Sequence, residues 1–358
     1  MVGTTELKVP AYGWAARDTS GHLSPFSFKR REHGPKDVVF DVKYCGICHS
    51  DLHQLKNEWG ASEYPMVPGH EIIGIVTKVG SEVTKFKPGD RVGVGCLVDS
   101  CMDCDACHKG LENYCPKMVW TYASNGFDGH PTYGGYSNVM VVKEHFALKV
   151  PENLPMDAAA PLLCAGITVF SPMKHFEMEK GGKNFGVIGL GGLGHMAAKI
   201  AKAFGMNVTV ISTSPNKEKE ARENLHADNF LVSKDPEAMK AAASTLDFII
   251  DTVSAPHAEE DYLSLLKVDG KLVIVGVPPH KMSISPGSLI NARRTLGGSL
   301  IGGLAETQEC LDFCGKHNVT CAIEKIPISY VNEAMVRLYN SDVHYRFVID
   351  IENTLKEE

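Results

Sequence analysis

Residues 184–194, NFGVIGLGGLG, decide the fold class of this chain. A β-branched apolar run ends in glycines spaced as G-x-G-x-x-G, and an apolar segment of helical period follows at 195–204. The first glycine of this pattern permits a tight turn, the second lets a pyrophosphate approach the backbone, and the third lets the helix pack on the strand. A purely structural glycine turn is the alternative. The predicted cofactor-binding residues of the loop are Gly189, Gly191, Gly192, Leu193 and Gly194.

The sequence after this loop alternates short apolar runs with helical segments. Such alternation predicts βαβ units, and hence an α/β, doubly wound parallel sheet. Six expected strands complete a six-stranded Rossmann domain, which we assign to residues 159–304. The expected strands lie at 184–190, 207–212, 229–233, 246–253, 270–277 and 294–303.

The first part of the chain has a different pattern. Short strands broken by Gly and Pro are expected at 38–46, 71–80, 91–98 and 140–150, and a Cys-rich loop occupies 99–116. We therefore assign residues 1–158 to a mostly β catalytic domain. The last segment, 305–358, is expected to return to that domain because the six-stranded sheet is already full.

The end of the second strand of the parallel sheet indicates which dinucleotide binds. An NAD site places Asp or Glu there to bond the ribose 2′-hydroxyl. This chain instead has Ser212, Thr213 and Ser214, with Lys217 shortly after. Hydroxyls and a cation accept a 2′-phosphate, which a carboxylate repels. An ordinary capped turn is the alternative, and the composition favours NADP(H).

Cys101, Cys104, Cys107 and Cys115 form C-x2-C-x2-C-x7-C within one loop. Four thiolates at this spacing predict a closed tetrahedral Zn²⁺ site with a structural role. An iron–sulfur cluster remains an alternative, because Pro116 follows the last cysteine. A nucleic-acid-binding zinc module is disfavoured, because the loop is acidic rather than basic.

A second set of possible metal ligands is dispersed along the chain: Cys48, His70, Glu71 and Cys164. Taken singly, Cys164 can be a core residue, His70 a hydrogen-bonded surface group, and Cys45 with Cys48 a redox pair. Two thiolates and one imidazole that leave a fourth position open are typical of catalytic zinc.

Composition excludes several classes of function. The 358-residue chain has a formal net charge of −7, 44% hydrophobic residues and 22% charged residues. The acidic balance argues against a nucleic-acid partner, and no apolar run approaches the roughly 18 residues of a membrane span. The N-terminal residues show no secretory pattern. We therefore expect a cytoplasmic protein with reduced cysteines and a small-molecule partner.

The motifs GHE, the four-cysteine loop, PLLCAG and GLGGLG occur here in the order that they have in the zinc-dependent medium-chain alcohol dehydrogenases, which the chain resembles. Segments such as YCGICHSDLHQLKNEWG and YRFVIDI are similar to the plant cinnamyl alcohol dehydrogenase-like branch. That branch includes sinapyl alcohol and mannitol dehydrogenase-like members and alkaloid reductases. The resemblance covers about Ala11 to Leu355. It implies a GroES-like catalytic domain, a Rossmann domain and a homodimer joined through the 294–303 edge strand.

The same resemblance implies roles for individual residues. Catalytic zinc falls on Cys48, His70 and Cys164, with Glu71 as a carboxylate that exchanges with substrate or water. Ser50 corresponds to the residue that touches the substrate oxygen, His53 to the next member of the proton relay, and Arg346 to an arginine near zinc and cofactor. The implied inventory is NADP(H) and two Zn²⁺ per subunit, one catalytic and one structural.

The implied reaction is hydride transfer between NADP(H) and a cinnamyl-type aromatic or allylic aldehyde or alcohol. Trp120, Leu300 and Glu58 are the expected pocket residues, but lignin-pathway members usually have Phe where Leu300 stands and Asp where Glu58 stands. These differences weaken a coniferyl or sinapyl assignment. An alternative is an NADPH-dependent reductase of an iminium or conjugated enal in plant alkaloid or terpenoid metabolism. A non-catalytic zinc-stabilised scaffold is a third alternative.

Overall fold

The computed structural model describes residues 7–278 and 281–357, and these form two compact units. Unit 1 comprises residues up to Cys164 together with those from Gly302 onward, and unit 2 is Ala165–Ile301. The expected return of the C-terminal segment to the first part of the chain is therefore seen in unit 1. Residues 159–164 and 302–304, which we expected in the Rossmann domain, lie in unit 1. The 3-10 helix Ala160–Leu163 packs on the main sheet of that unit, and the helix that begins at Leu304 belongs to the same unit. Residues 1–6 and 358 of the predicted domains lie outside the described residues.

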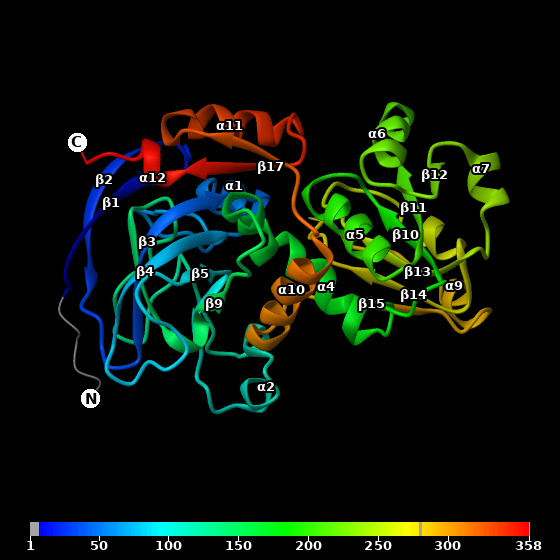
Figure 1. Cartoon of the computed structure of the whole chain (residues 1–358). Helices are drawn as coiled ribbons and strands as arrows, with labels where there is room; N and C mark the ends of the chain where they lie inside the picture. Colours follow the sequence, from blue (N-terminus) through cyan, green and yellow to red (C-terminus); the bar gives the residue numbers. More distant parts are fainter. Residues whose placement is uncertain (1–6, 279–280, 358) are drawn as a thin grey trace. The chain divides into compact units, whose positions relative to one another are not determined.

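Unit 2 contains the predicted parallel sheet, with strand order β12-β11-β10-β13-β14-β15 (Figure 1). All five neighbouring pairs are parallel. β10 and β13 begin the two halves of the sheet, so their carboxyl ends mark the switch point where such sheets bind ligands. The strands are β10 (Asn184–Ile188), β11 (Asn207–Ser212), β12 (Asn229–Val232), β13 (Leu246–Asp251), β14 (Leu266–Ile274) and β15 (Thr295–Gly298).

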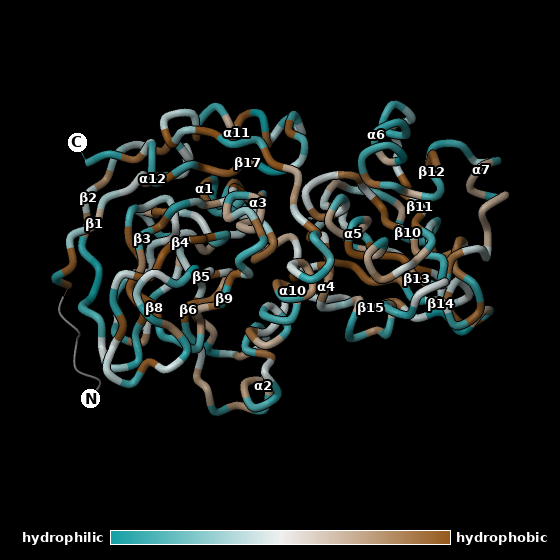
Figure 2. Tube along the Cα trace, viewed as in Figure 1, coloured by the Kyte–Doolittle hydropathy of each residue, from teal (hydrophilic) through white to brown (hydrophobic). Residues whose placement is uncertain are grey.

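Helices connect these strands. Central strands such as β13 are apolar and brown in Figure 2, whereas α6 is mostly hydrophilic. Leu263, Leu266 and Ile249 belong to the apolar core, each fully buried. Parallel strands that are covered on both faces of the sheet are usually continuous apolar runs, as these strands are. The helices are α4 (Ala165–His175), α5 (Gly192–Ala203), α6 (Glu218–Glu223), α7 (Pro236–Ala241), α8 (Glu259–Leu263) and α9 (Pro286–Ile290).

Unit 1 is built on a seven-stranded sheet in the order β16-β17-β3-β4-β5-β9, with β8 also paired to β3. The expected strand 140–150 is broken into β8 and β9 by a 3-10 helix at Glu144–Phe146. The sheet strands are β3 (Asp37–Gly46), β4 (Ile72–Val79), β5 (Arg91–Val94), β8 (Val139–Lys143), β9 (Leu148–Lys149), β16 (Ile323–Ile326) and β17 (Arg346–Asp350).

Two small antiparallel pairs complete the β structure of unit 1: β1 (Leu7–Ala16) with β2 (Leu23–Arg31), and β6 (Leu97–Asp99) with β7 (Val119–Trp120). The long β1–β2 hairpin was not predicted, because Pro10, Gly13 and Pro25 interrupt its strand pattern. The helices are α1 (His49–Leu55), α2 (Asp105–His108), α3 (Met156–Ala159), α10 (Leu304–His317), α11 (Val331–Tyr339) and α12 (Ile351–Thr354).

No single helix among the described residues has the length and apolar composition needed to cross a membrane. One bent pair, Met156–Leu163 with Ala165–His175, passes that test by length and composition alone. Nearly all the central residues of this pair are buried within the protein.

Candidate active site and metal centres

The dispersed set of predicted ligands converges at one place in unit 1. Ligand atoms of Cys48, His70, Glu71 and Cys164 all lie within 4.8 Å of one another, and all four residues are buried. Cys48 is the N-cap of α1, immediately after β3, and His70 and Glu71 precede β4. Cys164 ends the 3-10 helix that packs on the sheet. Its Sγ lies 3.8 Å from Cys48 Sγ and 3.3 Å from His70 Nε2.

The chemistry of these donors fits zinc. Both Glu71 carboxylate oxygens are buried and have no hydrogen-bond partner among the described residues, although Oε1 lies 3.2 Å from Arg346 Nη1. Burial raises the pKa of Glu71 to about 7, against the opposing charge of Arg346. A buried carboxyl group with no hydrogen bond is costly, and a divalent cation offsets that cost. Two thiols, one imidazole and this carboxylate are ligands that catalytic zinc uses.

The two thiols of this site lie in contact and shift each other's pKa in opposite directions. Contact with the Cys164 thiol lowers the pKa of Cys48 well below its usual value, and the reciprocal contact raises the pKa of Cys164. Cys96, for which the sequence suggests no metal role, also contacts Cys164, and this contact lowers the pKa of the Cys96 thiol. Cys45 instead donates to the Gly46 carbonyl, at 3.6 Å. Cys48 therefore lies with Cys164, and the redox-pair alternative with Cys45 has no support in this geometry.

Asp51 is a residue of the candidate site that sequence reasoning missed. Its buried carboxylate lies 3.2 Å from His70 Nδ1 and accepts hydrogen bonds from the backbone N–H groups of Cys48, at 2.8 Å, and Gly69, at 3.2 Å. The Tyr136 hydroxyl also donates to it, at 3.3 Å. A metal-binding histidine commonly donates its other ring nitrogen to such a carboxylate, which fixes the tautomer and orients the ring. The signal in the sequence was an acidic residue three positions after Cys48, at the start of a helix.

The predicted proton relay lies on α1. Ser50 and His53 are three residues apart on this helix and hence on the same side of it, and Ser50 Oγ lies 3.6 Å from Cys48 Sγ. His53 Nδ1 lies 2.5 Å from Glu58 Oε2. Glu58, which we expected as a pocket residue, is a hydrogen-bond partner of His53, and its place in a substrate pocket stays a prediction. The catalytic roles of Ser50 and His53 stay predictions.

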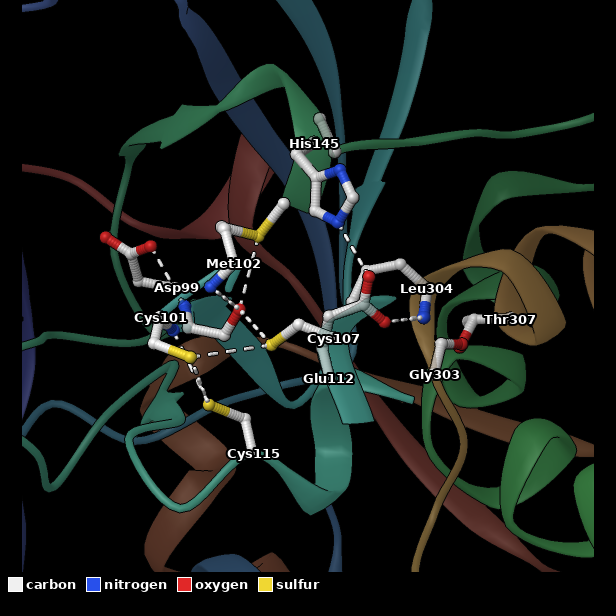
Figure 3. Close-up of polar contacts among 12 residues, drawn as sticks. Asp99, Cys101, Met102, Cys107, Glu112, Cys115, His145, Gly303, Leu304 and Thr307 are labelled. Carbon is white, nitrogen blue, oxygen red and sulfur yellow. Dashed lines mark hydrogen bonds and ion pairs between the residues drawn. The ribbon is translucent and has the colours of Figure 1, made fainter. Parts of the chain in front are cut away.

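The four-cysteine loop closes on itself as the spacing predicts. Sγ of Cys115 lies 3.4 Å from that of Cys101 (Figure 3). Sγ of Cys104 lies 3.5 Å from that of Cys107. The Lys117 backbone N–H donates to Cys115 Sγ at 3.3 Å. Hydrogen bonds from the backbone N–H groups of residues 103 and 104 and from neighbouring thiols lower the pKa of Cys101 to about 6. All four ligand atoms lie within 4.8 Å of one another, so the loop suits tetrahedral zinc.

Figure 3 also shows how this loop is tied to α10. The buried Glu112 carboxylate accepts a hydrogen bond from the Leu304 backbone N–H, at 3.0 Å, and lies 2.7 Å from His145 Nε2. Leu304 begins α10, so one carboxylate satisfies an unpaired N–H group at the helix N-terminus and carries the negative charge favoured there.

We expect Glu112→Ala to lower the free energy of unfolding of unit 1 by about 2–3 kcal/mol, because it leaves the Leu304 N–H group and His145 without their shared acceptor. Burial raises the pKa of Glu112, but His145 and the Leu304 N–H together lower it below its usual value. This stabilisation is therefore present above the unfolded-state pKa and is lost as the pH falls through the folded-state pKa. Urea unfolding of zinc-loaded protein at pH 7 and pH 4 measures both effects, with the exposed Glu357→Ala as control. Equal stability of Glu112→Ala and wild type at pH 7 would contradict the assignment.

The predicted dinucleotide loop has the required backbone. Gly189 has φ +88°, and a Cβ on Gly194 would lie 2.1 Å from the Gly189 carbonyl oxygen. A Cβ on Gly191 meets nothing within 4 Å, so this position faces open space at the N-cap of the twelve-residue helix α5. A phosphate fits such a helix N-terminus. Lys217 Nζ donates to the Leu190 carbonyl at 3.1 Å and so reaches this loop from the end of β11.

The predicted pocket residues are divided between the two units. Trp120 and Glu58 lie in unit 1, and Leu300, 39% exposed, lies in unit 2, so the substrate pocket stays a prediction. Arg346 donates to the Ile47 carbonyl at 3.3 Å besides its ion pair with Glu71, and its role toward the cofactor also stays a prediction. A cavity of about 460 Å³ in unit 1 is lined by none of the predicted site residues.

The chain matches two known protein-family models. Residues 34–152 match the alcohol dehydrogenase GroES-like domain, and residues 192–316 match the zinc-binding dehydrogenase domain. The chain belongs to the zinc-dependent medium-chain alcohol dehydrogenases. Within this family it is 62% identical to 8-hydroxygeraniol dehydrogenase of Catharanthus roseus, over 98% of each chain. It is 60% identical to vomilenine reductase of Rauvolfia serpentina, over 99% of each chain.

Solved structures of the family have the same fold as this chain. A cinnamyl alcohol dehydrogenase of Sorghum bicolor superposes with a TM-score of 0.94 at 55% identity, over 98% of this chain and 99% of that one. The CAD of Helicobacter pylori, solved with NADP(H), superposes with a TM-score of 0.90 at 41% identity, over 97% and 99% of the two chains. The GroES-like domain with a parallel Rossmann sheet, expected from sequence, is confirmed, and the chain is an oxidoreductase of the alcohol dehydrogenase type.

Proposed function

We propose that this protein is a zinc- and NADP(H)-dependent alcohol dehydrogenase that interconverts aromatic or allylic aldehydes and their alcohols. The observation that carries the proposal is the convergence of Cys48, His70, Glu71 and Cys164 within 4.8 Å in a buried site. Two of its relatives are named 8-hydroxygeraniol dehydrogenase and cinnamyl alcohol dehydrogenase, and both of the alcohols in these names are allylic. The complex of the Helicobacter pylori enzyme with NADP(H) supports the coenzyme.

The residues of this chain supply the acid–base and positioning parts of the reaction. Zinc, when bound, provides a Lewis acid that polarises a carbonyl oxygen or acidifies an alcohol. Asp51 holds the His70 ring through Nδ1, which leaves Nε2 for the metal. Ser50, beside Cys48, is placed to exchange the alcohol proton, and His53 with Glu58 passes protons to solvent.

A second candidate is reduction of an iminium or conjugated enal, which the similarity to vomilenine reductase favours. Hydride addition to an iminium carbon gives a neutral amine without any proton transfer, so that reaction does not need the Ser50–His53 relay, yet both residues are present here. Their retention favours the carbonyl reaction. A non-catalytic scaffold is disfavoured, because the glycine loop and all four ligands of the open site are intact.

The test is NADPH oxidation by the zinc-loaded protein against cinnamaldehydes, monoterpene aldehydes and strictosidine-derived iminium substrates. We expect turnover of several aldehydes, with the reverse reaction on the matching alcohols and NADP⁺. Turnover restricted to iminium or enal substrates would overturn the carbonyl assignment in favour of the second candidate.

We expect Ser212→Asp to move the preference for NADPH over NADH by about two orders of magnitude toward NADH, because a carboxylate repels the 2′-phosphate and bonds the ribose hydroxyl. Ser212 ends β11 and is 8% exposed, and its Oγ accepts a hydrogen bond from the Ser214 N–H. The measurement is kcat/KM for each coenzyme with one aldehyde. Ser212→Asn, a neutral substitution of similar size, is the matched control. An unchanged NADPH preference in Ser212→Asp would remove the end of β11 from coenzyme selection.

We also propose a cytoplasmic homodimer, joined by β15 of two copies. β15 is an edge strand of its sheet, and edge strands present unpaired backbone groups to a partner. Light scattering after gel filtration tests the dimer. A monomeric mass at micromolar concentration would contradict it.

A further inference from the structure

Asp251 and His257 form a pair in unit 2 that none of the assigned roles uses. Asp251 is the last residue of β13, at the switch point of the sheet, and is 1% exposed. Its Oδ2 lies 2.7 Å from His257 Nε2. The pair therefore closes the turn 252–257 back onto the end of its own strand.

This turn lies against the dinucleotide loop. The Thr252 backbone N–H and side-chain hydroxyl both donate to the Ile188 carbonyl, at 3.1 and 2.7 Å, and Ile188 directly precedes the first glycine of the loop. A Cβ on Gly189 would lie 2.8 Å from Val253 Cγ2, and a Cβ on Gly194 would lie 3.3 Å from Thr252 Oγ1. Because the contact is this close, a change in the turn displaces the glycine loop.

The two hydrogen bonds of His257 indicate the protonation state of its ring. His257 Nδ1 lies 2.8 Å from the Ala255 carbonyl oxygen, and Nε2 faces the Asp251 carboxylate. When Asp251 is ionised, both acceptors require an N–H group, and only the imidazolium form of histidine has two. The second Asp251 oxygen, Oδ1, accepts the Val253 backbone N–H at 3.0 Å. Neutral His257 therefore has to give up one of its two bonds to the turn.

The groups around His257 favour the charged form. Besides Asp251, the negative charge of Glu259 also stabilises the imidazolium form of His257. The centroid of the Tyr262 ring, on α8, lies 5.9 Å from that of the His257 ring. Burial by itself lowers the pKa of His257, but the Ala255 carbonyl, Asp251 and Glu259 together raise it above its usual value. Burial raises the pKa of Asp251, and its bonds to Val253 and His257 offset only part of that rise.

We propose that Asp251 and His257 are positioning residues for NADP(H): the protonated pair holds the 252–257 turn under the dinucleotide loop, and affinity for the coenzyme falls when His257 loses its proton. The proposal rests on the coenzyme assignment made above. It adds a pH-sensitive support to that site, built from residues that need not touch the coenzyme themselves.

Asp251→Asn separates this idea from a purely structural role. The oxygen of the introduced side-chain amide can still accept the Val253 N–H, while the amide nitrogen donates to Nε2 of neutral His257, whose Nδ1–H keeps the Ala255 bond. The variant therefore satisfies the turn with neutral rather than charged histidine. In His257→Gln nothing titrates at this position, so the affinity should be low at every pH.

The experiment is titration of zinc-loaded protein with NADPH, followed by the fluorescence of the bound coenzyme, from pH 6.5 to 9.5. We expect the wild-type Kd to rise about tenfold with pH, since one charge-assisted hydrogen bond is lost. Asp251→Asn should bind more tightly at high pH than at low pH, and His257→Gln should be weak and flat. The exposed His33→Gln is the control and should follow the wild type.

Profiles of Asp251→Asn and His257→Gln parallel to that of the wild type would overturn the proposal, provided that circular dichroism shows folded proteins. A reversed profile for Asp251→Asn supports it, because simple destabilisation cannot invert a pH dependence. Absence of NADPH binding by wild type at any pH would instead contradict the coenzyme assignment, so the two failures are distinguishable.

Discussion

Cys164→Ala should lose one of the two zinc ions and nearly all turnover. Its Sγ lies 3.8 Å from that of Cys48 and 3.3 Å from His70 Nε2, so its removal leaves an incomplete ligand set in a buried site. Lewis-acid assistance is worth several kcal/mol, and we expect kcat/KM for aldehyde reduction to fall by roughly 10³-fold or more. Metal content by mass spectrometry and kcat/KM with NADPH are the measurements.

The matched control is Cys310→Ala, which also removes a buried thiol of unit 1 but has no place in either metal cluster. It should keep both metal equivalents and most of the activity. The four-cysteine loop should stay loaded in Cys164→Ala, because its ligands are local to residues 101–115. Full zinc content or wild-type turnover in Cys164→Ala would show that the open site is not the catalytic centre.

Ser50→Ala should slow alcohol oxidation by about 10²-fold or more, the range typical of general acid–base groups, while both zinc ions stay bound. Ser50 lies on α1 beside Cys48, and the same helix carries His53, whose Nδ1 is paired with Glu58. Without the hydroxyl, the alcohol proton has no first carrier toward that pair. Steady-state oxidation of one alcohol between pH 6 and 10 is the measurement.

Ser50→Thr is the control for this prediction, since it keeps the hydroxyl and adds only a methyl group. It should restore most of the rate and the wild-type pH profile. If Ser50→Ala oxidises alcohols as fast as the wild type, the relay runs through other groups. If Ser50→Thr is as slow as Ser50→Ala, steric crowding rather than the missing proton carrier explains the loss.

The features that the sequence predicted best are those written in short stretches of chain. The parallel sheet and its glycine loop follow from β-branched runs and from G-x-G-x-x-G, because a turn and the start of a helix are local geometry. Where the sequence pattern was ambiguous, tertiary packing decided the secondary structure. The segment 140–150 is apolar enough for one strand, yet it is divided by a 3-10 helix at Glu144–Phe146. Pro and Gly similarly concealed the β1–β2 hairpin.

The same distinction applies to the candidate metal sites: local spacing predicted one of them, and tertiary packing assembles the other. Spacing alone predicted that the four thiols of residues 101–115 come together, because ligands this close in the chain can reach one metal ion without long-range packing. It could not show that Cys48 and Cys164, 116 residues apart, meet with His70. It also left open whether Cys45 or Cys164 is the partner of Cys48, which depends on how β3 and the 3-10 helix before Cys164 pack.

The sequence by itself determined the fold class and predicted the four-cysteine loop and the glycine loop, since the strand, turn and ligand patterns behind each of them are local to the chain. Only the tertiary structure showed which side chains meet: Asp51 with His70, Glu58 with His53 and, in unit 2, Asp251 with His257. These contacts join different strands, turns and helices. Their partners are selected by packing and by the need to satisfy buried charge, which no local pattern records.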